Sequence, residues 1–318
     1  MNDRYDVVIV GGGAAGLGGA LSLTRARRSV LVIDAAEPRN APAEHMHNYL
    51  GREGAAPGDL LRTGRDEVAG YGAEFTAGDV VAVRRVERGF LVALHDSREV
   101  AARQLLVASG LVDELPDLPG VRERWGRDVL HCPYCHGWEV RDRPIGVLAT
   151  SPLAVHQVLM WRQWSDDVVL FTHTAAAFDA ADLEKFAARG IRVVDGEVTG
   201  LEVTDDRLTG IRLADGAVVA REALVVPPKF AARMGFLDGL GLEPATQQMG
   251  GEVIGTYLAA DQTGATAAAG VWAAGNVTDP RAQVISAAAQ GVAVGAMINA
   301  ALIEEDVAAA VAEYSVAR

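Results

Sequence analysis

Two cysteines are the residues of this sequence best suited to chemistry. Cys132 and Cys135 are its only cysteines, separated by Pro-Tyr, with His131 before the pair and His136 after it. Two intervening residues suit a reversible disulfide at the start of a helix, where the helix dipole lowers the pKa of the first thiol. The motif therefore predicts a dithiol/disulfide centre. His136 is the predicted proton acceptor, because an imidazole titrates near neutral pH and can deprotonate a thiol.

Other interpretations of the same motif remain open. Its two histidines and two cysteines are four potential zinc ligands, but adjacent Cys and His side chains diverge and no second cysteine pair exists, so we expect no metal. The thiols could also form a buried, inert pair, and His136 could be a structural histidine. His45 and His47, in a loop just before Asn48, are alternative bases if that loop reaches the face of the cofactor predicted below.

A glycine-rich turn near the N-terminus predicts a dinucleotide site. A β-branched run at residues 5–10, typical of a buried parallel strand, leads directly into Gly-Gly-Gly-Ala-Ala-Gly. Gly11 makes the tight turn, Gly13 lets the backbone approach a pyrophosphate, and Gly16 lets helix and strand pack closely. After a helix and a second strand, Asp34 is placed to accept ribose hydroxyls. The predicted contacts of this site are Gly11, Gly13, Ala14, Ala15, Gly16 and Asp34.

Two later segments favour FAD as the dinucleotide. Residues 270–276 are a strand that ends in small residues and the polar Asn276, and a long small-residue helix follows. This arrangement resembles the second FAD motif of the two-dinucleotide flavoprotein disulfide reductases, which usually has Asp where Asn276 stands. An earlier strand ends in Ala-Ser-Gly and resembles the same family's Ala-Thr-Gly. The flavin contacts predicted from these two segments are Ala108, Gly110, Gly275, Asn276, Gln283 and Val284.

The same order of predicted elements occurs twice in the chain, which predicts an α/β fold of two Rossmann-like, three-layer domains. The βαβ starts lie at 5–34 and 145–172, and a β-meander follows each, at 80–95 and 199–213. Segments rich in Pro or Gly mark the crossings between the copies. The predicted domains are an FAD-binding domain of residues 1–115 and 238–318 and a central NAD(P)-type domain of residues 119–235 that carries the cysteine pair.

The phosphate loop of the second copy is altered. Ala149, Ser151 and Ala154 stand where the first copy has its three glycines. A side chain at Ser151 blocks close backbone approach, and Pro152 has no N–H to offer a phosphate. These two residues instead suit the N-cap and first position of a helix. After the next strand the sequence is Thr-His-Thr at 172–174, without the arginines that would bind a 2′-phosphate. We therefore expect this copy not to bind NADPH strongly.

Composition limits the classes of partner. Half of the 318 residues are hydrophobic, which allows a large core. Acidic residues outnumber basic ones, 42 against 29, and no Lys/Arg run occurs, so we expect neither nucleic acid nor an anionic membrane as partner. The apolar stretch 282–303 contains Gln290 and Asn299, which favours a packed helix over a membrane span. With no signal-peptide pattern and no disulfide framework, the expected location is the cytoplasm.

Over nearly its full length the chain resembles the low-molecular-weight thioredoxin reductases. Within them it is most similar to the dithiol oxidases that close disulfides in gliotoxin-, holomycin- and romidepsin-type natural products. The run Cys-Pro-Tyr-Cys-His-Gly-Trp-Glu at 132–139 and the altered nucleotide loop carry this resemblance. Thioredoxin reductases have Asp directly after the second Cys and an intact second glycine motif. The resemblance implies a thioredoxin reductase-like homodimer with one FAD per subunit and the redox pair against the isoalloxazine. It further implies FAD contacts from Ala35, Arg39, Asn48 and the backbone of Val81.

The function expected from these features is FAD-dependent oxidation of a small-molecule dithiol. A substrate thiolate attacks the disulfide at Cys132, and the second substrate thiol then displaces Cys132. Cys135, placed nearer the flavin, passes the electrons on, and molecular oxygen accepts them to give hydrogen peroxide, without NADPH. One alternative is a thioredoxin-type disulfide reductase that uses NADPH or ferredoxin. Another is a flavin- or zinc-bearing redox sensor without enzymatic activity.

Overall fold

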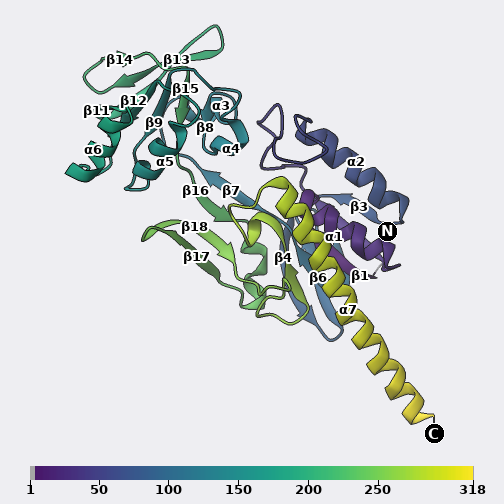
Figure 1. Cartoon of the computed structure of the whole chain (residues 1–318). Helices are drawn as coiled ribbons and strands as arrows, with labels where there is room; N and C mark the ends of the chain where they lie inside the picture. Colours follow the sequence, from purple (N-terminus) through teal and green to yellow (C-terminus); the bar gives the residue numbers. More distant parts are fainter. Residues whose placement is uncertain (1–3, 318) are drawn as a thin grey trace.

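A seven-stranded sheet forms the first half of the architecture (Figure 1). The structure is a computed structural model and describes residues 4–317. The strand order is β3-β2-β1-β6-β5-β4, and β19 pairs in parallel with β6. The strands are β1 (Arg4–Val10), β2 (Val30–Asp34), β3 (Glu74–Ala77), β4 (Val80–Val86), β5 (Gly89–Leu94), β6 (Glu99–Val107) and β19 (Val271–Ala273). The helices of this half are α1 (Ala14–Arg25), α2 (Pro57–Gly70) and α7 (Val284–Val316).

The residues of β1 show how this sheet separates two layers. Val7 and Ile9 pack with residues of α1 and α7, whereas Val8 packs with residues of the β4–β5 meander. Successive side chains of a strand point to opposite faces, so the apolar run at residues 7–10 of β1 must be covered on both sides. The helices and the meander provide the two covers.

Small residues bring α1 and α7 into close contact. A Cβ atom added at Gly291 of α7 would lie 1.9 Å from the carbonyl oxygen of Ala15. By length and composition alone α7 could cross a membrane, with a mean hydropathy of 1.5 over its most apolar part. Its polar residues have partners inside the protein: Gln290 accepts a hydrogen bond from the backbone N–H of Gly275, and Asn299 accepts one from Arg28. The predicted packing of this stretch as a helix is therefore what the structure shows.

The second half repeats the three-layer plan around a five-stranded parallel sheet, with order β11-β10-β9-β15-β8. Its strands are β8 (Val129–Leu130), β9 (Ile145–Leu148), β10 (Val168–Phe171), β11 (Arg192–Val194) and β15 (Ala223–Val225). One face packs against α5 (Ala154–Trp161) and α6 (Ala180–Ala188), and the other against the meander β12 (Val198–Thr204), β13 (Arg207–Leu213) and β14 (Val218–Val219). The predicted pair of Rossmann-like α/β units is confirmed.

A four-stranded sheet lies where the chain crosses between the halves, with order β17-β18-β16-β7. Its strands are β7 (Leu111–Glu114), β16 (Lys229–Ala232), β17 (Pro244–Met249) and β18 (Glu252–Leu258). β16 falls inside the predicted central domain, yet both strands that it pairs with lie outside those residues. The domain boundaries stay a prediction. The remaining short helices are α3 (Val121–Arg124), α4 (Pro133–His136), η1 (Gly235–Leu240) and η2 (Gly275–Val277).

Candidate redox and cofactor site

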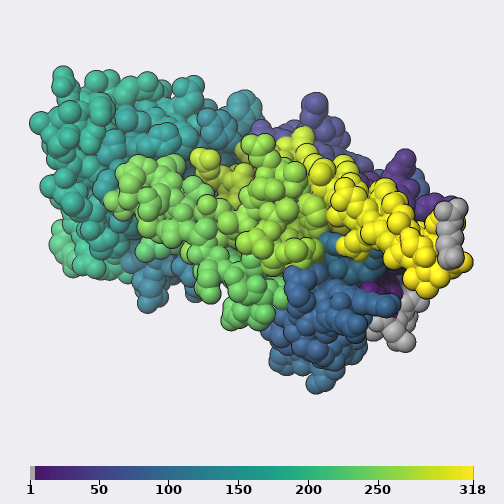
Figure 2. All heavy atoms as spheres, turned by 90° about the horizontal axis from the view of Figure 1, so that it is seen from below, coloured from purple at the N-terminus to yellow at the C-terminus, as the bar shows by residue number. Residues whose placement is uncertain are grey.

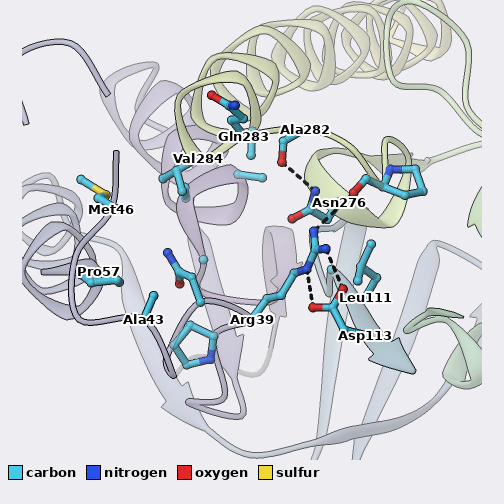
Figure 3. A pocket seen from close by; sticks show the side chains of 18 of the residues that line it. Arg39, Ala43, Met46, Pro57, Leu111, Asp113, Asn276, Ala282, Gln283 and Val284 are labelled. Atoms are coloured by element: carbon cyan, nitrogen blue, oxygen red, sulfur yellow. Dashed lines mark hydrogen bonds and ion pairs between the residues drawn. The ribbon is translucent and has the colours of Figure 1, made fainter. Parts of the chain in front are cut away.

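One large cavity joins the glycine-rich turn to the cysteine pair. Its volume is about 1,130 Å³, above the roughly 300–1,000 Å³ of ordinary small-molecule sites, so it has room for an extended dinucleotide together with a substrate. Figure 3 shows the part of its wall near Arg39 and the start of α7. The predicted site residues that line it are Gly11, Gly13, Ala14, Ala15, Asp34, Ala35, Arg39, Ala108, Gly110, Cys132, Cys135, His136, Asn276, Gln283 and Val284.

The glycine-rich turn has the form that a pyrophosphate requires. A Cβ atom at Gly11 would lie 2.4 Å from the carbonyl oxygen of Ala108, and the φ of Gly11 is +107°. A Cβ atom at Gly13 would meet nothing within 4 Å, so the space beside this residue is open. Gly13 is also the N-cap of α1 and provides no side-chain cap, which leaves the first N–H groups of the helix available to an anion. These residues fit FAD.

The carboxylate of Asp34 has two partners within the protein. Its Oδ1 accepts a hydrogen bond of 3.1 Å from the backbone N–H of Gly12, and its Oδ2 forms an ion pair with Arg65 of α2. Arg65 also lines the cavity, although no local pattern in the sequence distinguishes it. A ribose at the predicted position would therefore contact an Asp–Arg pair.

Asn276 lines the cavity beside the start of α7 (Figure 3). Its Nδ2 donates to the carbonyl oxygens of Asp279, at 3.0 Å, and Ala282, at 2.9 Å. The Oδ1 atom keeps its acceptor capacity for a ribityl hydroxyl. Gln283 is the N-cap of α7 and makes no side-chain cap, so this helix also presents unpaired N–H groups. Two uncapped helix N-termini on one cavity wall are suited to the diphosphate and to the carbonyl edge of a flavin.

Two of the predicted contacts, Gly16 and Gly275, lie behind the cavity wall. A Cβ atom at Gly16 would come within 1.9 Å of the carbonyl oxygen of Gly11, so this glycine serves helix–strand packing. Gly275 has a φ of +81°, and a Cβ atom there would lie 2.7 Å from that of Ala15. Both glycines shape the turns that carry the contacts, without facing the cavity themselves.

Asn48 and Val81 are not among the residues that line the cavity. Val80 lines it instead, and the side chain of Val81 is half-exposed. The side-chain amide of Asn48 donates to the backbone carbonyl of Tyr134, between the two cysteines. The resemblance assigned Asn48 to the cofactor, whereas the structure places its side chain against the redox segment.

The two thiols lie at the start of α4, close enough to interact. Cys132 is the N-cap of α4, and its Sγ lies 2.7 Å from the Sγ of Cys135; both are free and half-buried. The thiol of Cys135 donates to Cys132 and lowers the pKa of Cys132 from its ordinary 9.0 to about 7, and Arg39 contributes a smaller effect. The same interaction, with burial, raises the pKa of Cys135. Because α4 has only four residues, the neighbouring thiol, and not a long helix dipole, is the main cause.

His136 follows Cys135 directly in the chain and lines the same cavity. Burial lowers its pKa, the charge of Glu139 opposes that effect, and the charge of His47 adds to it. A neutral imidazole next to Cys135 can accept a proton from a thiol and later return it.

The structure adds an arginine–carboxylate pair beside the thiols. Arg39 donates to both oxygens of Asp113, at 2.7 and 2.9 Å, and lies over the ring of Phe230. His131 packs edge-to-face on that ring, and burial followed by the charge of Arg39 lowers the pKa of His131 to about 4. Asp113 was not predicted as a site residue, because its partner Arg39 is 74 residues away along the chain.

The helix after the altered loop of the second copy begins later than predicted. Contrary to the prediction of Ser151 and Pro152 as the N-cap and first helical residue, α5 begins at Ala154 with Leu153 as its N-cap. Ser151 accepts a hydrogen bond from the N–H of Leu153, which completes a turn ahead of the helix. The side chain of Leu153 packs against the apolar cluster that includes Phe230.

The segment that follows β10 is engaged in backbone contacts. His173 accepts a hydrogen bond from the N–H of Val198, and Thr172 accepts one from the N–H of Gly196. Burial lowers the pKa of His173, which opposes a positive charge at this position. Within residues 4–317, no group of three or more His, Cys, Asp and Glu side chains is arranged to hold a metal ion.

Three kinds of comparison relate the chain to known proteins. The family model described as "Pyridine nucleotide-disulphide oxidoreductase" matches residues 5–291. The chain is 31% identical to "Thioredoxin reductase tcpT" of Claviceps purpurea over 75% of its own length and 78% of the relative's. It is 33% identical to "Thioredoxin reductase aclD" of Aspergillus oryzae over 76% and 81% of the two chains. The crystal structure of HlmI superposes with a TM-score of 0.91 at 48% identity, covering 99% of this chain and 98% of that one.

Proposed function

The chain belongs to the pyridine nucleotide-disulphide oxidoreductase family, among its thioredoxin reductase-like FAD-binding flavoproteins, and we propose that it is an FAD-dependent dithiol oxidase. In this proposal it closes a disulfide in a small-molecule dithiol and uses molecular oxygen as the acceptor. Written with R for the substrate scaffold, R(SH)₂ and O₂ give R(S–S) and H₂O₂, so atoms and electrons balance.

The observation that carries the proposal is the placement of two unequal thiols on the cavity that also contains the dinucleotide cradle. Cys132 favours the thiolate near pH 7, whereas Cys135 holds its proton. Such a pair can exchange with a substrate thiol at one sulfur and release or take up a proton at the other. Both sulfur atoms are half-buried in the wall, which suits a small dithiol better than a protein disulfide.

The residues of this chain would share the reaction as follows. His136 accepts the proton of a substrate thiol, and the resulting thiolate attacks Cys132. The Cys132–Cys135 bond breaks and the proton passes to Cys135, whose raised pKa favours the thiol. The second substrate thiol then passes its proton to His136, and its thiolate displaces the Cys132 thiolate and closes the product disulfide. When bound, FAD accepts the electron pair of the reduced cysteines and delivers it to oxygen.

Independence from NADPH is supported by the second nucleotide loop. Ala149, Ser151 and Ala154 stand where the first loop has its glycines, and Pro152 offers no N–H to a nucleotide phosphate. The alternative, a disulfide reductase fed by NADPH or ferredoxin, is favoured by one finding: the curated relatives bear the name thioredoxin reductase.

One pair of assays separates the two activities. In air, the oxidase should convert dithiothreitol with production of H₂O₂; under anaerobic conditions, NADPH should leave the flavin oxidised. Cys132→Ser and Cys135→Ser should each reduce turnover by about 10³-fold or more while the protein stays yellow. Rapid bleaching of the flavin by NADPH would favour the reductase instead. Absence of peroxide with every dithiol tried would count against any oxidase, and would leave the redox-sensor interpretation.

The remaining features of the proposal concern partners and location. Thioredoxin reductase-like proteins are commonly homodimeric, and we propose the same state here. We also propose a cytoplasmic location and no nucleic-acid or membrane partner, on the strength of the acidic composition.

A further inference from the structure

A closed loop at residues 46–55 approaches the redox motif from the first half of the molecule. Its base is tied at Met46, whose N–H donates to the carbonyl of Ala55 at 2.9 Å, while the N–H of Gly54 donates to the carbonyl of Met46 at 3.0 Å. The side chain of Met46 is buried. A loop with joined ends and its own buried anchor can hold its tip in one orientation.

Glu53 fixes the tip from inside the loop. One carboxylate oxygen lies 2.6 Å from Nδ1 of His47, and the other accepts a hydrogen bond of 2.8 Å from the backbone N–H of Asn48. The hydrogen bond to His47 lowers the pKa of Glu53 and so keeps it ionised. Asn48 has a φ of +61°, a left-handed conformation that Asn tolerates better than most residues. This conformation directs its side chain toward the redox segment.

The tip contacts the redox segment on both sides of Cys135. The Nδ2 of Asn48 donates to the carbonyl of Tyr134 at 2.5 Å, and Nε2 of His47 lies 3.3 Å from a carboxylate oxygen of Glu139. Both ring nitrogens of His47 thus face carboxylates, and only the protonated ring can donate to both. Tyr134 and Glu139 bracket Cys135 and His136 in the sequence.

We propose that His47 and Asn48 are positioning residues for the redox pair. A helix of four residues is not stable by itself, so contacts from elsewhere must fix α4. Asn48 fixes the carbonyl between the two cysteines, and His47 fixes the carboxylate that faces His136. Together they set the direction of the Cys135 thiol and the proton exchange at His136. The inference rests on the proposed function, since it assigns these residues to the thiol-oxidation step.

The test uses substitutions that keep the loop intact. Asn48→Asp preserves size and left-handed tolerance but cannot donate, and Asn48→Gly removes the side chain while relaxing the backbone. His47→Gln keeps an N–H donor but cannot bridge two carboxylates with a ring. Arg52→Ala, an exposed residue of the same loop, is the matched control. The measurements are hydrogen–deuterium exchange of residues 132–139, alkylation of the reduced thiols by iodoacetamide, and anaerobic bleaching of the flavin by dithiothreitol.

Because one hydrogen bond is lost, we expect both Asn48 variants to show roughly 3- to 10-fold slower bleaching of the flavin. We also expect faster hydrogen–deuterium exchange across residues 132–139 in both variants. His47→Gln should give the smaller effect, and Arg52→Ala should match the parent protein. Unchanged exchange and alkylation in both Asn48 variants would overturn the inference, even if turnover falls. If dithiothreitol fails to bleach the parent protein, the proposed function fails, whereas the exchange and alkylation data still decide whether the loop positions the thiols.

Discussion

At the scale of single residues, the two thiols differ because one donates to the other. Cys132 accepts from Cys135, and this hydrogen bond is the largest cause of its lowered pKa. The consequence has a definite sign. Above about pH 7 the Cys132 thiolate predominates. Below that pH, the fraction of Cys132 present as thiolate falls about tenfold for each pH unit.

Alkylation of the anaerobically reduced protein tests this difference. Carboxymethylation of Cys132, followed by peptide mapping, should rise with pH and reach half its maximal rate near pH 7. Cys135→Ala removes the donor, so the midpoint should move up toward the ordinary value and the rate at pH 7 should fall about tenfold. A parent midpoint near pH 9, or one that the substitution leaves in place, would show that the thiols are independent.

Site residues that follow from local sequence spacing could be predicted, whereas contacts between segments far apart in the chain could not. Gly11, Gly13 and Asp34 were predictable because a turn and the ends of two adjacent strands follow from local spacing. The partner of Asn48 was not, since Tyr134 is 86 residues away and only the packing of the two halves brings them together. The pairing of Asp34 with Arg65 was missed because the packing of α2 within the first half, and no local pattern, brings the two side chains together.

At the scale of elements, the start of α7 depends on an amide where the family usually has an acid. Asn276 donates to two backbone carbonyls, of Asp279 and Ala282, and a carboxylate at this position could donate to neither. The helix dipole would favour the added negative charge by only about 0.3–1 kcal/mol, less than two lost hydrogen bonds of about 1 kcal/mol each.

Asn276→Asp should therefore lower the free energy of unfolding by about 1–2 kcal/mol and weaken FAD retention, although it restores the residue usual in the family. Urea denaturation with flavin fluorescence measures both effects. Asn299→Asp is the matched control on the same helix, because Asn299 uses its oxygen to accept from Arg28 and the acid keeps that acceptor. Equal stability of Asn276→Asp and the parent protein would remove the assigned role of the amide.

The strands with a continuous apolar pattern were predicted at the right residues, but the start of helix α5 was not. The strands at 145–148 and 168–171 lie where the β-branched runs place them. The start of α5 was wrong, because Ser151 and Pro152 have the right types for a helix start. In the structure these two residues form a turn ahead of the helix, and Leu153 is the N-cap.

At the scale of the whole molecule, the far end of α7 projects beyond the body that the rest of the chain forms (Figure 1), and Figure 2 shows it on the outside of the molecule. Polar contacts hold the helix as far as Asp306, which pairs with Arg28 and Arg103. Beyond it every described side chain is exposed. For the proposed homodimer, we place the second copy of the chain against the apolar face of this extension.

The apolar residues of this extension supply the surface for such a dimer. Ile303, Val307, Val311 and Tyr314 recur at intervals of four, four and three residues, which places them on one face of the helix, and each is 49–60% exposed. Two charges on that face, Val307→Glu with Val311→Glu, should weaken the dimer by about tenfold or more, since each buries an unpaired carboxylate. Ala312→Glu adds a charge on the opposite face and should leave association unchanged. Sedimentation velocity over a range of concentrations distinguishes these results. A double variant as dimeric as the parent protein would assign dimerisation to another surface, whereas a monomeric parent protein would contradict the homodimer itself.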